Sequence, residues 1–170
     1  MNISDLIIRE LTSADEASFR EAHRIVAPED VPFGLGFEPE MSWAEYLKHR
    51  DDQKHGRNLG EWVASTFLVA VNNERVIGRV SIRHELNDFL RRQGGHIGYC
   101  VLPDFRGQGI ATKLLHRGIE VARSHGNEEL LVTCNVNNLA SARVIEKCGG
   151  VLAEVDESMS LKRFRIATAD

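Results

Sequence analysis

Apolar side chains follow two patterns along the chain, and each pattern predicts a different kind of element. Short apolar runs bounded by Gly, Pro, Asn or Asp predict β-strands, whereas apolar side chains three or four positions apart predict amphipathic helices. The first pattern predicts strands at residues 7–11, 66–71, 76–82, 96–102, 130–134, 151–155 and 159–166. The fifth run is apolar without alternation, which is typical of a strand buried on both faces.

Helical spacing occurs in four segments of the chain. The first follows Thr12 or Ser13, the second follows Ser42 and the fourth follows Asn138, and each of these side chains can cap a helix N-terminus. The third segment begins after two glycines and has small or apolar residues at positions 111, 114, 115, 118 and 122. The polar segment 85–93 is expected to hold a helical turn.

Turn residues separate these elements. Residues 72–75 join two strands into a predicted hairpin, and residues 156–158 join the last two strands. Residues 27–39 hold three of the four prolines and are expected to form a loop. The resulting order, β-α-α-β-β-β-α-β-α-β-β, predicts one α/β domain over residues 1–170, with a mixed sheet and helices on both faces.

The junction at residues 101–112 joins a predicted strand to a predicted helix through two glycines. Pro103 ends the strand because proline cannot donate to a ladder. The first turn of the following helix leaves backbone N–H groups free, and the helix dipole adds partial positive charge there. Gly107 and Gly109 let an anion approach the backbone, and Arg106 can add a forked cationic donor. The junction therefore predicts a diphosphate site, with packing-only glycines as the alternative.

This junction resembles the signature of the GNAT superfamily of acyl-CoA-dependent N-acyltransferases: Gln or Arg, two residues, Gly, one residue, then Gly or Ala. Arg106, Gly109 and Ala111 match that signature. A second block at residues 138–150 resembles the family's second cofactor-side helix, which an Asn opens and a Glu-Lys-x-Gly closes. The resemblance implies a mixed, mostly antiparallel sheet with two splayed central parallel strands. It also implies N-acetyl transfer from acetyl-CoA to a primary amine of a small molecule or peptide, by direct attack in a ternary complex.

The same resemblance implies which residues hold acetyl-CoA. The pantetheine arm would pair with the edge of the strand before the glycines, as a peptide augments a sheet edge. Asn138 would contact this arm, with a plain helix N-cap as the alternative reading. The expected cofactor-binding residues are Cys100, Val101, Leu102, Arg106, Gly107, Gln108, Gly109, Ile110, Ala111, Thr112, Asn135, Asn138 and Ser141.

His96 is the residue expected to act as general base. It aligns with the strand position where many superfamily members place a carboxylate, and an unperturbed imidazole titrates near neutral pH. A structural histidine beside two glycines is the alternative. The family's usual acid, a Tyr, is replaced here by Ile145. We therefore expect Ser141 to donate a hydrogen bond to the leaving thiolate, with water as the alternative.

For the acceptor amine, the resemblance points to the loop between the first two helices. We expect Phe33, Phe37, His84 and Asn87 to line the acceptor site, with core packing or a surface loop as the alternatives. Carboxylates between residues 29 and 40 would attract an ammonium group.

Composition narrows the possible functions further. The net charge of −4 over 170 residues gives no reason to expect a nucleic-acid partner. The three cysteines and seven histidines lack metal-ligand spacing, so we expect no metal site. Scattered cysteines, with no secretory signal or membrane span, predict a cytoplasmic protein that does not act at a membrane. Exposed final strands favour a homodimer, and a catalytically silent acyl-CoA-binding protein is the alternative function.

Overall fold

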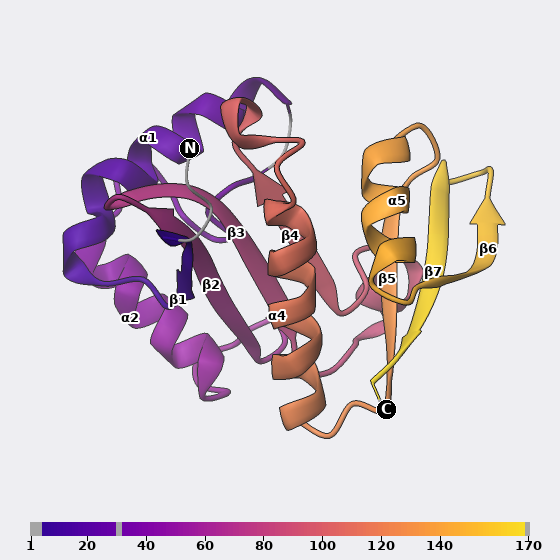
Figure 1. Ribbon diagram of the computed structural model, residues 1–170. Helices are drawn as coiled ribbons and strands as arrows, with labels where there is room; N and C mark the ends of the chain where they lie inside the picture. Colours follow the sequence, from indigo (N-terminus) through magenta and orange to yellow (C-terminus); the bar gives the residue numbers. More distant parts are fainter. Residues whose placement is uncertain (1–4, 30–31, 169–170) are drawn as a thin grey trace.

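The computed structural model describes residues 5–29 and 32–168. Figure 1 shows helices and strands in an order that matches the predicted one, with a short α3 between the third and fourth strands. The helices and strands are β1 (Ile7–Arg9), α1 (Glu16–Val26), α2 (Trp43–Lys54), β2 (Ser65–Asn72), β3 (Arg75–Arg83), α3 (Asp88–Arg92), β4 (Ile97–Val101), α4 (Ile110–Ser124), β5 (Glu129–Asn135), α5 (Leu139–Lys147), β6 (Val151–Asp156) and β7 (Leu161–Ala167).

Local side-chain chemistry sets several of these boundaries. Oγ of Ser42 accepts the backbone N–H of Glu45, and the carboxylate of Glu45 accepts the backbone N–H of Ser42, so α2 begins with a capping box. Asn87 accepts a bond from the N–H of Leu90 and starts α3. The hairpin between β2 and β3 is tighter than expected, because residues 73 and 74 alone form the turn, with φ values of 47° and 63°.

The strands form two sheets in which every pairing is antiparallel. One sheet has the order β1-β2-β3-β4 and the other has the order β5-β7-β6. Figure 1 shows α4 and α5 beside each other on one side of the molecule, with α1 and α2 on the opposite side of the first sheet.

Two apolar clusters fill the space between helices and sheet. Successive residues of β2 point to opposite faces. Leu68 and Ala70 pack with α4 and α5 in one cluster, whereas Phe67, Val69 and Val71 pack with α1 and α2 in the other. The predicted mixed α/β architecture with helices on both faces is therefore confirmed.

The two sheets meet where β4 and β5 begin. The backbone N–H of His96 donates to the carbonyl of Leu131 at 2.7 Å, and no ladder pairs the two strands. Gly95 makes this approach possible, since a Cβ there would lie 2.3 Å from the oxygen of Leu131. The parallel, splayed relationship expected for β4 and β5 stays a prediction.

None of the helices in the described part of the chain has the length and apolar character needed to cross a membrane. The three cysteines are free and buried. Burial raises the pKa of each thiol, which keeps all three protonated and unreactive near neutral pH.

Candidate active site

The N-terminus of α4 has the geometry that a diphosphate site requires. Gly107 and Gly109 have φ values of 73° and 79°, in the left-handed region that favours glycine, and Gly109 is the N-cap of the helix. A Cβ at either position would meet nothing within 4 Å, so protein packing does not explain these glycines. The first helical N–H groups, at residues 110–112, precede the first intrahelical bond, which runs from Lys113 to Gly109. An anion at this helix end would find free donors and an open approach.

Arg106 is turned away from the expected role of a forked phosphate donor. Its Nε donates to the carbonyl of Val101 at 3.0 Å, and its Nη2 lies 2.6 Å from the carboxylate of Glu29. The hydrogen bond that Arg106 donates to Glu29 raises the pKa of the guanidinium, which stays charged. The side chain ties the loop after β4 to the segment after α1. Gln108 donates to the carbonyl of Asp104 within the same loop.

The free edge of β4 lies just before this loop. Backbone groups alternate in direction along an antiparallel strand. The N–H of Leu102 donates to Ile77 of the β3 side at 2.9 Å, so the backbone groups of Val101 and Tyr99 face away from β3. Of the three residues expected to contact the pantetheine arm, Val101 thus presents its backbone outward, whereas the side chain of Cys100 is buried beneath α1 and α2.

Tyr99 reaches from β4 to the first turn of α5, a contact that the sequence did not reveal. Its hydroxyl lies 2.7 Å from Oγ of Ser141. Asn138 accepts a bond from the N–H of Ser141 at 3.0 Å and caps α5, and Asn135 accepts one from Asn137. Burial raises the pKa of Tyr99 to about 12, so its hydroxyl is protonated at neutral pH. Ile145 is fully buried.

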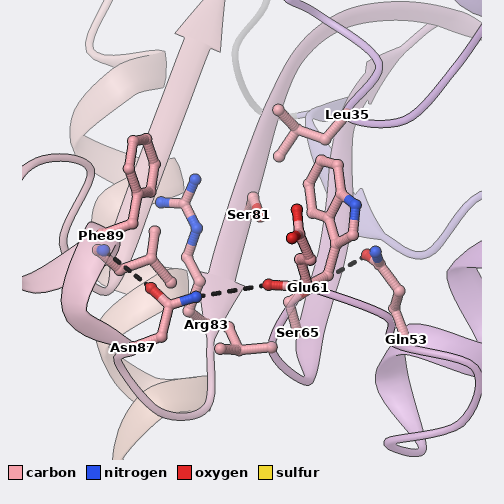
Figure 2. A pocket seen from close by; sticks show the side chains of 11 residues that line it. Leu35, Gln53, Glu61, Ser65, Ser81, Arg83, Asn87 and Phe89 are labelled. Atoms are coloured by element: carbon pink, nitrogen blue, oxygen red, sulfur yellow. Dashed lines mark hydrogen bonds between the residues drawn. The ribbon is translucent and has the colours of Figure 1, made fainter.

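A cavity of about 640 Å³ opens on the α2 side of the first sheet, between β2, β3 and α3. Figure 2 shows Arg83 and Phe89 on one wall and Glu61 on the opposite one, with Ser81 between them. Asn87 bridges the two walls, because its amide nitrogen donates to the carbonyl of Glu61 at 3.5 Å. The lining residues are Leu35, Gln53, Glu61, Trp62, Val63, Ser65, Ser81, Arg83, Asn87, Phe89 and Leu90.

Only part of the expected acceptor site lies at this cavity. Asn87 lines it, and its role in binding the acceptor stays a prediction. Phe33 and Phe37 do not: both are buried against Phe19, with ring centroids 5.5 and 5.4 Å away, and they belong to the core beneath α1 and α2. The prediction that they line a pocket is corrected, because their aromatic surface is already buried against the protein. Leu35 of the same loop lines the cavity instead.

His84 and His96 line a different cavity, of about 450 Å³. His84 hydrogen-bonds Thr66 through Nε2 and stacks on His125 at 3.7 Å. Burial and the neighbouring His125 lower the pKa of His84 to about 4.

His96 uses one ring nitrogen to hold β5. Its Nδ1 accepts the backbone N–H of Leu131 at 2.9 Å, which places the proton of the neutral ring on Nε2. Burial lowers the pKa of the ring, so the neutral form is the favoured one. With the Nδ1 lone pair engaged, this geometry favours the structural alternative over the general base. The catalytic role of His96 stays a prediction.

Comparison with known proteins agrees with this arrangement. The sequence pattern of the acetyltransferase (GNAT) family matches residues 37–150. N-alpha-acetyltransferase 30 of Schizosaccharomyces pombe is 30% identical over 89 residues, which cover 52% of this chain and 59% of that protein. The chain thus spans little more than half of this relative's length.

Solved structures share the fold over nearly the whole chain. The yncA acetyltransferase of Salmonella typhimurium, solved with acetyl-CoA, superposes with a TM-score of 0.68 and 20% identity, covering 98% of this chain and 95% of that one. An N-acetyltransferase of Staphylococcus aureus Mu50 gives a TM-score of 0.65 with 16% identity, covering 96% and 99% of the two chains. Since the family pattern spans most of the chain and includes both the glycine turn and α5, this protein belongs to the GNAT family of acetyltransferases, which use acetyl-CoA as co-substrate.

Proposed function

We propose that the chain transfers an acetyl group from acetyl-CoA to a primary amine of a small molecule or peptide, by direct attack in a ternary complex. The observation that carries the proposal is the position of β4 between two sites. The glycine turn and the start of α4 follow this strand, and on the α2 face of the sheet the guanidinium of Arg83, which lines the 640 Å³ cavity, lies over Gly98. An acceptor in the cavity can thus approach β4 from the face opposite α4 and α5.

In such a reaction the protein positions the two substrates and stabilises the charge that develops during the transfer. The free N–H groups at residues 110–112 would hold the diphosphate, and the outward backbone of Val101 would align the pantetheine arm. Bound acetyl-CoA supplies the thioester that the amine attacks and the thiol that leaves. Tyr99 and Ser141 offer hydroxyl groups on the α5 side of β4, where Ile145 cannot donate.

Proton removal from the ammonium group has two candidate routes. A base at His96 is the route that the sequence favours. The engaged Nδ1 of His96 counts against that route, and Glu61 is the carboxylate that lines the acceptor cavity. A water in the cavity, with Glu61 as proton acceptor, is the route that the geometry supports better.

Release of free thiol from acetyl-CoA, measured with a panel of amines, tests the proposed function. The expected result is amine-dependent thiol release that saturates with both substrates. A protein that binds acetyl-CoA yet turns over none of the amines would instead be the silent acyl-CoA-binding protein. Membership of an acetyltransferase family favours turnover.

Assembly and compartment are proposals as well. The exposed strand β6 carries Val151, Leu152 and Val155 with exposed fractions of 70%, 46% and 46%. Covering this apolar strand in a homodimer would remove that surface from water. A cytoplasmic location fits the free cysteines.

A further inference from the structure

The acceptor cavity contains a guanidinium without an acidic partner. Arg83 extends from β3 into the cavity wall, and its Nη1 donates to the carbonyl of Gly94 at 3.3 Å. Among the described residues, no carboxylate forms an ion pair with Arg83. Burial and the neighbouring charge of Arg79 lower the pKa of Arg83 to about 10, which still leaves the side chain charged at neutral pH.

The neighbouring strand β4 leaves space for the guanidinium of Arg83. Gly98 of β4 faces the guanidinium, and a Cβ there would lie 3.2 Å from Nη1 of Arg83. Arg79 approaches the same point, since its Nη1 donates to the carbonyl of Gly98 at 2.9 Å. Two cationic side chains thus converge on the face of β4 where the acceptor is expected.

A second, independent feature of the cavity also calls for an acceptor oxygen. Gln53 is 1% exposed and lines the cavity, and its Nε2 has no hydrogen-bond partner. Its Oε1 accepts from the hydroxyl of Ser65 at 3.2 Å. A buried amide donor left unpaired costs free energy. Because Nε2 is covered by neighbouring protein atoms, a ligand oxygen pairs with it and recovers that cost only when a side chain of the cavity wall shifts.

The remaining walls limit what else the ligand carries. Trp62, Phe89 and Leu35 give the cavity an apolar lining. Glu61 stands on the wall opposite Arg83, so a ligand with a carboxylate and an amine matches the charges of both walls (Figure 2). A polyamine, which bears positive charge alone, would place a cation near Arg83.

We propose that the acceptor is an amino acid, or a molecule that likewise joins an amine, a carboxylate and an apolar side chain, and that Arg83 binds its carboxylate. The assignment rests on the proposed function, because it names the acceptor for that reaction. An N–H donor from Gln53 adds a second contact, and the side chain packs against Trp62 and Phe89.

Binding of two acetylated products provides a test that does not need turnover. N-acetylphenylalanine and N-acetylphenylalaninamide have the same side chain and no free amine, and they differ in the carboxylate alone. Fluorescence of Trp62, which is 49% exposed at the cavity, reports binding. The variant Trp62→Phe shows how much of the fluorescence change comes from Trp62 and how much from the buried Trp43. Because a charge-assisted contact is worth about 1.5–3 kcal/mol, we expect the acid to bind roughly tenfold or more tightly than the amide.

Four variants test whether the preference arises at the cavity. Arg83→Met and Gln53→Leu should each lose most of the preference for the acid, whereas Arg117→Met, on the exposed surface of α4, should keep all of it. Arg83→Lys keeps the charge and should retain part of the preference. Circular dichroism and thermal unfolding show that each variant is folded.

The outcomes for the two proposals are separable. Equal binding of acid and amide, undetectable binding of the acid, or an undiminished preference in Arg83→Met would overturn the carboxylate assignment. Turnover of amines without tighter binding of the acid would support the proposed acetyl transfer and contradict the assignment of Arg83 to a carboxylate. A preference for the acid without thiol release from any amine would support the carboxylate site and contradict the proposed acetyl transfer.

Discussion

The hydroxyl of Tyr99 lies 2.7 Å from Oγ of Ser141 and joins β4 to the first turn of α5. The family resemblance implies a Tyr on α5 as the usual donor to the leaving thiolate, and we expect Ile145 to stand in its place. Tyr99 presents a phenol from the neighbouring strand instead. Its raised pKa makes it a hydrogen-bond donor rather than a ready source of protons at neutral pH.

Removing the hydroxyl of Tyr99 tests this role. Tyr99→Phe keeps the ring that packs between β4 and α5, so we expect the Kd for acetyl-CoA to stay within about twofold while kcat falls on the order of tenfold to a hundredfold. Ser141→Ala should lower kcat less, because Tyr99 remains. Steady-state kinetics and calorimetric binding measure both quantities. Unchanged kcat in Tyr99→Phe would mean that the pair is structural.

Substitution of Gly109 tests the diphosphate site. Valine at this position adds bulk where the first helical N–H groups face the ligand, so we expect acetyl-CoA affinity to fall by roughly tenfold or more. Gly126, at the far end of α4, is the matched control: its φ is 82°, and a Cβ there also meets open space. Both Gly109→Val and Gly126→Val impose the backbone strain of a positive φ, and Gly109→Val alone should weaken binding. Equal affinities of the two variants for acetyl-CoA, measured by calorimetry, would show that the diphosphate does not bind at this turn.

Local chemistry explains why much of the fold followed from the sequence. The capping box of Ser42 and Glu45, the hairpin at residues 73–74 and the glycines before α4 all depend on neighbours within a few positions. The placement of helices on both faces followed from periodicity, and the structure adds that alternating side chains of β2 divide between two apolar clusters.

The site was less predictable, because its contacts join distant segments. Tyr99 meets a residue 42 positions away, and His96 meets one 35 positions away. Nothing in the sequence states that Phe33 is buried in the core or that Arg83 lacks an acidic partner. The polar side chains of Ser81 and Arg83, at the end of an otherwise apolar run, were the available signal for the cavity.

Replacement of His96 separates its two candidate roles. His96→Ala leaves the buried N–H of Leu131 without its acceptor, so we expect unfolding in urea to show a loss of roughly 1–3 kcal/mol. The folded variant should keep kcat within a few fold, with the same pH–rate profile near neutrality. A general base would instead contribute on the order of a hundredfold to the rate. A hundredfold fall in kcat with unchanged stability would establish His96 as the base.

Acid stability should reflect the buried histidines. Burial lowers the pKa values of His23, His49 and His96, and the pKa of His84 is lowered to about 4. Each ring binds its proton more readily in the unfolded chain, near pH 6.5, than in the folded one. The unfolded state therefore takes up more protons between pH 6.5 and about 4, and the free energy of unfolding must fall as the pH falls through that window.

Carboxylates account only for the acidic end of this range, because the contributions of Glu45, Asp52 and Asp156, whose pKa values are lowered, are lost near and below their unfolded values of 4.5 and 3.8. The pKa of Asp15 is lowered as well, but its contribution is present above its unfolded pKa of 3.8 and is lost only below that value. Urea unfolding between pH 7.5 and 4.5 should therefore show a decline that is reduced in His84→Gln. His125→Gln should reduce it by a smaller amount, since it removes the neighbouring charge that helps to lower the pKa of His84. His116→Gln, on the exposed surface of α4, has the same number of histidines as His84→Gln and should leave the decline unchanged. A stability that is flat from pH 6.5 to 4.5, or a decline of the same size in His84→Gln and His116→Gln, would show that His84 does not stay neutral in the folded protein.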